Sequence, residues 1–263
     1  SELTALTAWC VILGYTLQLY FDFSGYCDLA AGCARLLGLR LPINFDSPYR
    51  SLSVTEFWKR WHMTLTAFLR ENVYFPLGGS RKGRGCTYLN ILVVYLVSGI
   101  WHGAGWTFIL WGLLHGLAQG LERLWGKRRD ALPRWVRWAM TFLFINLAWV
   151  FFRAPDVSSA LLLLKTAVTG GMGGIRLWLV NGLFRREISA LELLLPVIGP
   201  YTAYLRVALI LGIGLLAALW PRNVIRQMDT FRPNWRSGLY VLAWTVWAIL
   251  SFTGVVTFIY SNF

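Results

Sequence analysis

The sequence is poor in charge for its length. Only 14% of its 263 residues are charged, whereas 57% are hydrophobic. A soluble domain of this size needs more charged side chains to cover its surface, so the composition excludes an ordinary soluble protein. Several apolar stretches approach the ~20 residues that cross a bilayer. We therefore expect an all-α polytopic membrane protein that forms a single integral membrane domain over residues 1–263.

Acidic residues are also scarce, with 12 Asp and Glu against 25 Lys and Arg. The basic residues form short clusters between apolar runs, as in membrane-protein loops, and this argues against a nucleic-acid partner. The loops at 123–137 and 222–236 hold six and four Lys or Arg residues. They are predicted to face the cytoplasm.

Cysteine is rare and unpatterned. Its four positions, Cys10, Cys27, Cys33 and Cys86, include no CxxC pair, so we expect free thiols and no metal site. The chain also lacks GxSxG, Walker A and HExxH motifs, and no bound cofactor is expected. It has no basic segment typical of a signal peptide and no initiator Met, so we expect a processed chain or a piece of a longer one.

What the chain does have is a series of apolar segments, from which we expect five or six membrane spans. The first is predicted over Leu3–Phe23 and is expected to end at Asp22. Later spans are predicted over 134–152, 201–220 and 238–260, with a short amphipathic helix in the mixed region between 154 and 200. Re-entrant and interfacial helices are expected besides the spans.

The segment between the first two apolar blocks is more polar. LPINFDSPYRSLS is predicted to be a loop, and Ser53 with Glu56 three residues later is typical of a capping box. The following EFWKRWHMTLTAFLREN predicts one amphipathic helix. Its apolar side carries Phe57, Trp58 and Trp61, which suits a protein groove or the membrane interface.

The stretch SGIWHGAGW lies in the middle of a longer apolar block at 87–121. About 35 residues at ~1.5 Å each would make roughly 50 Å of helix, nearly twice the thickness of the hydrocarbon core. Gly99, Gly103 and Gly105 fall near its middle, and both ends are basic. The block therefore predicts two short helices that form a hairpin and return to the same side.

Only three histidines exist, at 62, 102 and 115. His102 is the strongest candidate, because ionisable residues inside a membrane usually line a site or a pathway. The adjacent glycines permit close approach of a ligand, and Trp101 and Trp106 are expected to wall a cavity. With no nucleophile in view, His102 would act most simply as a general base on a hydroxyl.

The other two histidines carry weaker signals. We interpret His115 as a helix-packing residue or one that supports site residues without touching substrate. His62 fits an interfacial role and a functional one equally well. Asp22 and Asp28 are six residues apart, so they share no helix face unless the helix breaks at Gly25. Asp22 is better interpreted as sealing a helix end or as pairing with a nearby arginine, Arg35 or Arg50.

Two long stretches resemble a known family. They are YFDFSGYCDLAAGCARLLGLRLPINFDSPYRSLSVTEFWKRWHMTLTAFLRENVYFPLGGSRKG and LVSGIWHGAGWTFILWGLLHG. Both are similar to the membrane-bound O-acyltransferase (MBOAT) family, and within it to the branch that O-acetylates alginate and other exopolysaccharides. The ending FTGVVTFIYSNF is similar to that branch as well. The match is dense from Leu17 to Glu122 and thinner beyond.

The resemblance implies a ring of membrane helices around a tunnel in a bacterial inner membrane, with several passes. His102, in WHG, matches the family's catalytic histidine, and His62, in FWKRWH, matches its second motif histidine across the tunnel. An acyl group, expected to be acetyl, would pass from a cytoplasmic thioester such as acetyl-CoA to an outer hydroxyl. Implied partners are periplasmic acetyltransferase-like proteins, a polysaccharide acceptor and membrane lipid. Further candidate substrate or tunnel residues are Trp61, Trp101, Trp106, Asp22, Asp28, Asn44 and Arg60.

The chain departs from the family pattern in three ways. Cys27 stands where the family usually has Ser, and Glu71 where it has Asp; both changes leave the expected chemistry intact. Family members also carry a comparable stretch of chain before YFDFSGY, so we expect this sequence to be the C-terminal half of a longer protein. Three other functions stay open: D-alanyl transfer to teichoic acid, a transporter with a proton-relay histidine, and a membrane scaffold that recruits partners.

Overall fold

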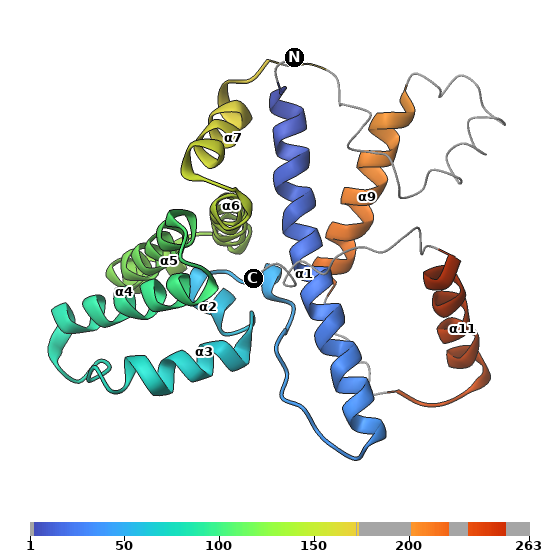
Figure 1. Cartoon of the computed structure of the whole chain (residues 1–263), viewed down its shortest axis with the longest axis horizontal. Helices are drawn as coiled ribbons and strands as arrows, with labels where there is room; N and C mark the ends of the chain where they lie inside the picture. Colours follow the sequence, from blue (N-terminus) through green and yellow to red (C-terminus); the bar gives the residue numbers. More distant parts are fainter. Residues whose placement is uncertain (1–2, 172, 174–200, 221–230, 251–263) are drawn as a thin grey trace.

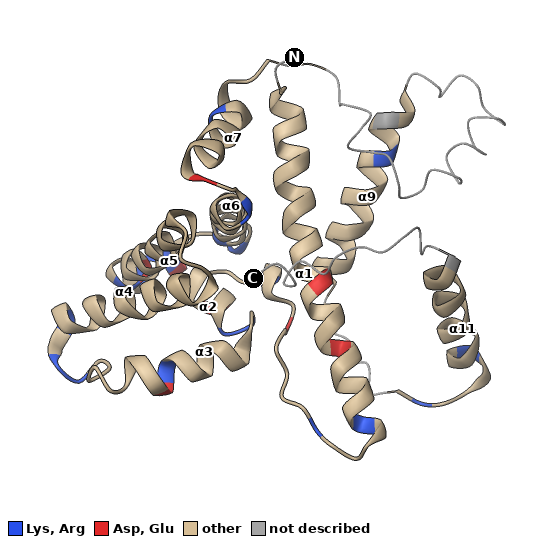
Figure 2. Cartoon of the chain, in the orientation of Figure 1, with Lys and Arg blue, Asp and Glu red and all other residues tan. Residues whose placement is uncertain are grey.

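The computed structural model describes residues 3–171, 173, 201–220 and 231–250, and these are helical with no strand among them. The α-helices are α1 Ala5–Leu36, α2 Val54–Trp58, α3 Met63–Leu69, α4 Gly83–His102, α5 Trp106–Trp125, α6 Arg134–Arg153, α7 Val157–Thr169, α9 Thr202–Leu219 and α11 Trp235–Leu250. Short non-α turns lie at Pro48–Arg50 (η1), Arg70–Tyr74 (η2) and Gly126–Ala131 (η3). In Figure 1, α1 runs through the middle, with α2 to α7 on one side and α9 on the other. Figure 2 shows long helices that are mostly uncharged, with Lys and Arg gathered at helix ends and connections.

The first helix is longer than predicted. α1 has 32 residues and continues through Gly25, so the expected end at Asp22 is wrong. A single polar residue or glycine inside an apolar run costs only ~1 kcal/mol, which packing against other helices readily offsets. The helix ends instead at Leu36, and the chain turns at Gly38 (φ 77°), where Gly38 N–H donates to Arg35 O and Leu39 N–H donates to Ala34 O. That left-handed glycine end is a signal which the sequence does contain.

The amphipathic segment is also broken where continuity was predicted. The Ser53 half of the expected capping box is confirmed, because Ser53 Oγ accepts from the N–H of Glu56 at 2.9 Å, whereas the Glu56 carboxylate accepts from the N–H of Leu52. The helix over 56–72 is not continuous, since His62 adopts φ 42° and ψ 56° and separates α2 from α3. The loop residue Asp46 donates its N–H to Arg60 O at 3.0 Å. Pairing of backbone groups with a distant loop therefore replaces helical hydrogen bonds here.

The hairpin in the apolar block is confirmed, although its arms are long. α4 and α5 each have 20 residues and pack along one another, joined at 103–105. Glycines make this contact possible: a Cβ on Gly99 would collide with Phe108 O, and one on Gly112 with Tyr95 O. Two backbones can approach this closely only where side chains are absent.

Membrane-length helices are fewer than expected in the described part of the chain. By length and composition, α4 and α6 are long and apolar enough to cross a bilayer. The helices predicted near 134–152 and 201–220 and the short amphipathic helix after 154 are confirmed as α6, α9 and α7. α11 covers part of 238–260, and the remainder lies outside the described residues, as does most of the basic loop at 222–236. The total of five or six spans stays a prediction.

The core is built largely from aromatic rings. It joins α1, the loop at 44–53, α2, α5 and α6, and its largest fully buried members are Trp111, Trp149 and Phe57. Trp111 and Trp149 stack with centroids 5.8 Å apart, and Phe57 stacks on Trp61 at 5.4 Å. This packed aromatic layer holds the segments that carry the histidines in fixed relation to one another.

Candidate active site

His102 is the last residue of α4 and lies where the hairpin turns. Its half-buried ring packs edge-on against Trp111 at 5.2 Å and against Phe152 at 5.0 Å. The next residue, Gly103, ends the helix, and a Cβ there would clash with the ring of Phe108. One side of the imidazole is therefore covered by rings from α5 and α6. The neighbouring residue Gly103 adds no side chain beside it.

His62 reaches the same region from the break between α2 and α3. Its ring lies edge-on to Phe23 of α1 at 4.9 Å and 6.3 Å from the ring of Trp101. Trp101 in turn contacts the ring of His102 at 4.8 Å. The structure thus brings together two histidines that lie 40 positions apart in the sequence, with one indole touching both.

Asn44 anchors His62 from the loop. Its Oδ1 lies 3.2 Å from His62 Nδ1 and also accepts from Thr64 N–H at 3.2 Å and from Thr64 Oγ1 at 2.7 Å. Its backbone oxygen accepts from Met63 N–H at 3.1 Å. Asn44 therefore holds both the ring and the strained backbone of the break.

Arg60 reinforces the same loop. Its guanidinium pairs with Glu56 at 2.9 Å and donates to the backbone oxygen of Asp46 at 3.2 Å. The Asp46 carboxylate lies 3.7 Å away. Arg60 therefore ties the loop to α2, and in the described structure its charge is engaged by carboxylates of the chain itself.

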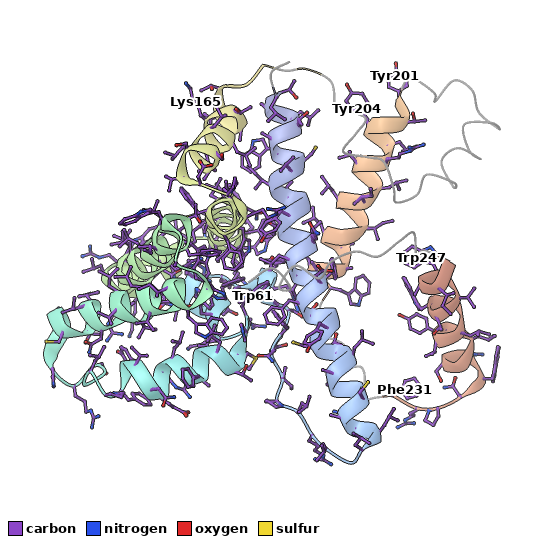
Figure 3. All side chains as sticks on the ribbon, viewed as in Figure 1. Trp61, Lys165, Tyr201, Tyr204, Phe231 and Trp247 are labelled. Carbon is purple, nitrogen blue, oxygen red and sulfur yellow. The ribbon has the colours of Figure 1, made fainter. Side chains whose placement is uncertain are left out.

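The other predicted site residues separate into different environments. Trp61 is 2% exposed and lies in the aromatic core beside Tyr20 and Trp149, at the crowded centre of Figure 3. Trp106 is 73% exposed and makes no ring contact with the other described residues. Asp22 and Asp28 lie on the continuous α1, and six helical positions place them roughly 120° apart. They consequently do not form a pair on one face.

Comparison with known sequences decides the family. A profile of the membrane-bound O-acyltransferase family matches residues 2–155, more than half of the chain. The chain belongs to this family. It is accordingly a membrane protein, and its WHG histidine and FWKRWH histidine are the two that the structure brings together.

Three curated relatives show where in the family the chain lies. A peptidoglycan O-acetyltransferase of Helicobacter pylori is 50% identical over 67% of this chain and 34% of its own length. A probable alginate O-acetylase of Pseudomonas putida is 42% identical over 76% of this chain and 40% of its own length. A teichoic acid D-alanyltransferase of Streptococcus thermophilus is 33% identical over 47% of this chain and 32% of its own length. The chain thus matches between about a third and two fifths of the length of these proteins.

His115 is a packing residue, as the sequence suggested. It is fully buried, and its Nδ1 accepts a hydrogen bond from Trp58 Nε1 at 3.1 Å. Its ring also packs against Trp111 and Phe144. This contact fastens α2 to α5.

Glu122 is the residue that sequence reasoning missed. Its carboxylate accepts from the N–H groups of Val54 and Thr55 and from Thr55 Oγ1, and Arg129 lies 3.5 Å from it. The sequence does contain a signal for it, because Glu122 is the only acidic residue between positions 72 and 129. Its hydrogen-bond partners Val54 and Thr55 could not be predicted, since they lie almost 70 positions earlier.

The cavities of the described structure lie away from the two site histidines. Among the described residues, no group of three or more His, Cys, Asp or Glu side chains is placed to hold a metal ion. All four cysteines are free. Cavities of about 200 and 460 Å³ lie beside α1, and both are lined by Val11, Tyr15 and Arg153. Neither is lined by His62 or His102, so the tunnel implied by the family resemblance stays a prediction.

Proposed function

We propose that this chain carries the catalytic centre of a membrane O-acyltransferase. The reaction moves an acetyl group from a cytoplasmic thioester such as acetyl-CoA to a hydroxyl of an extracytoplasmic polysaccharide or partner protein. The observation that supports this best is the meeting of His62 and His102 around Trp101, with His102 packed against the rings of Trp111 and Phe152. Two histidine side chains brought together in this way suit proton removal from a bound alcohol.

The proposed chemistry is direct transfer. The acceptor oxygen attacks the thioester carbonyl while His102 takes the hydroxyl proton. The tetrahedral intermediate then collapses, the carbon–sulfur bond breaks, and the proton passes from His102 to the departing thiolate. The products are an ester and a free thiol. General base catalysis of this kind contributes on the order of 10²- to 10⁴-fold, and fixed placement of both substrates adds to it.

Acetyl is favoured over D-alanyl as the transferred group. The relatives named as O-acetyltransferases of peptidoglycan and alginate are 50% and 42% identical to this chain. The relative named as a D-alanyltransferase is 33% identical over a smaller share. The proposal extends to a multi-pass location in the bacterial inner membrane and to periplasmic acetyltransferase-like partners, with the polysaccharide as final acceptor.

The experiment uses the whole protein that contains this chain, in membranes supplied with a radiolabelled acetyl thioester and, separately, a D-alanyl thioester. We expect label to enter the acceptor from the acetyl donor. His102→Ala should lower transfer at least ~100-fold at unchanged membrane levels. Undiminished transfer by His102→Ala would overturn the general-base role. Absence of transfer from either donor by the wild-type protein, together with histidine-dependent solute or proton movement, would favour the transporter.

A further inference from the structure

The hydrogen bonds around Asn44 identify which atom faces His62. Thr64 N–H is a backbone donor and cannot accept, and it lies 3.2 Å from the same Asn44 atom that faces the imidazole. That atom is therefore the amide oxygen, and the Thr64 hydroxyl at 2.7 Å also donates to it. The Thr64 backbone N–H therefore determines the orientation of the Asn44 side-chain amide.

This orientation in turn determines the tautomer of His62. An amide oxygen only accepts, so His62 Nδ1, 3.2 Å away, must carry a hydrogen and donate it. In a neutral imidazole the other nitrogen, Nε2, then has a free lone pair. Burial lowers the pKa of His62 to about 4, which keeps the ring neutral near pH 7.

The ring is held on more than one side. Phe23 meets it edge-on at 4.9 Å with planes 89° apart, and Trp101 lies 6.3 Å away. The left-handed backbone of His62 is itself held by the bond from Met63 N–H to Asn44 O. Rotation that exchanged the two nitrogens would break the bond to Asn44.

We propose that Asn44 is a positioning residue that holds His62 in the Nδ1–H tautomer and so makes Nε2 a hydrogen-bond acceptor for the acyl acceptor's hydroxyl. The substrate part of this statement rests on the proposed acyl transfer, whereas the tautomer part does not. His62 and His102 would then share the work. His62 Nε2 orients the hydroxyl, and His102 removes its proton.

The tautomer is tested by ¹⁵N NMR of the whole protein labelled at histidine, with His62→Ala used to assign the His62 signals. We expect wild type to show a protonated Nδ1 and an unprotonated Nε2 at pH 7. Asn44→Leu should abolish this preference, whereas Asn44→Asp, which keeps an acceptor oxygen, should preserve it. Thr64→Val is the matched control, because it removes a neighbouring donor and leaves Asn44 in place. A wild-type spectrum with hydrogen on Nε2 overturns the proposal even if Asn44→Leu fails to fold.

Acyl transfer provides the second measurement. We expect kcat of Asn44→Leu to fall by about 10- to 100-fold, with Asn44→Asp restoring most of the loss. The two proposals fail differently. If the tautomer is as described and the wild-type protein transfers no acyl group, the proposed function fails. If transfer depends on His62 but the His62 tautomer is the same in Asn44→Leu as in wild type, the positioning role of Asn44 fails.

Discussion

Glu122, near the end of α5, closes the N-terminus of α2 by accepting hydrogen bonds from the backbone N–H groups of Val54 and Thr55. The first N–H groups of a helix have no partner within it, so a carboxylate here satisfies donors and meets the positive end of the helix. The contact joins the hairpin that carries His102 to the segment that leads to His62. It acts together with the aromatic core and the Trp58–His115 hydrogen bond, which also join α2 to α5.

Removing this carboxylate should loosen the site. Glu122→Ala leaves two backbone donors and the Thr55 hydroxyl without their partner, and we expect the free energy of unfolding to fall by about 1–3 kcal/mol. Thermal unfolding in detergent measures the change. Glu71→Ala is the control, because the Glu71 side chain is 62% exposed and, among the described residues, pairs with Arg70 alone, at 3.7 Å. Equal melting temperatures for the two variants would contradict the capping role.

The glycines of the hairpin should differ sharply in their tolerance of alanine. A methyl group on Gly99 would press on the backbone carbonyl of Phe108, and overpacking of this kind costs about 1–3 kcal/mol. Gly85 lies in the same helix with nothing within 4 Å of its Cβ position, so alanine there should stabilise α4 by up to ~1 kcal/mol. Unfolding of Gly99→Ala and Gly85→Ala in parallel tests this. If Gly99→Ala were as stable as Gly85→Ala, α4 and α5 could move apart without cost, and close contact at Gly99 would not be required.

His115 should prove structural. His115→Phe leaves the buried Trp58 Nε1–H without its acceptor, so we expect a loss of about 1–3 kcal/mol in unfolding free energy. Trp58→Phe removes the donor, and the double variant should lose less than the sum of the single losses. Acyl transfer per folded molecule should stay near the wild-type rate in His115→Phe. Its disappearance from a fully folded variant would place His115 in the chemistry instead.

The two ends of the hairpin should lie on one side of the membrane. Cys86, in the first turn of α4, is exposed, and Lys127 is the second residue after α5. With other thiols replaced, Cys86 and an introduced cysteine at Lys127→Cys should react with a membrane-impermeant maleimide from the same face. The basic residues nearby predict that this face is cytoplasmic. Labelling of the two positions from opposite faces would exclude the hairpin.

Part of this protein follows from local sequence patterns. The length of the apolar block and its central glycines determined the hairpin, since no single helix of that length fits a bilayer. The cost of an ionisable ring in such a segment singled out His102. The pattern around Ser53 and Glu56 determined where α2 begins, because a helix cap depends on residues only three positions apart.

Other features came only from the tertiary structure. The sequence predicted a helix end at Asp22 and a continuous helix through His62, and both were wrong, because contacts with distant residues outweigh a local preference of ~1 kcal/mol. Asn44 meets His62 across 18 positions, and Glu122 meets Thr55 across 67. The sequence by itself determined the hairpin and the approximate positions of several helices, and it singled out His102 as a candidate. Only the fold decided that His62 faces Trp101, because that contact depends on a strained residue held by the Asn44 loop.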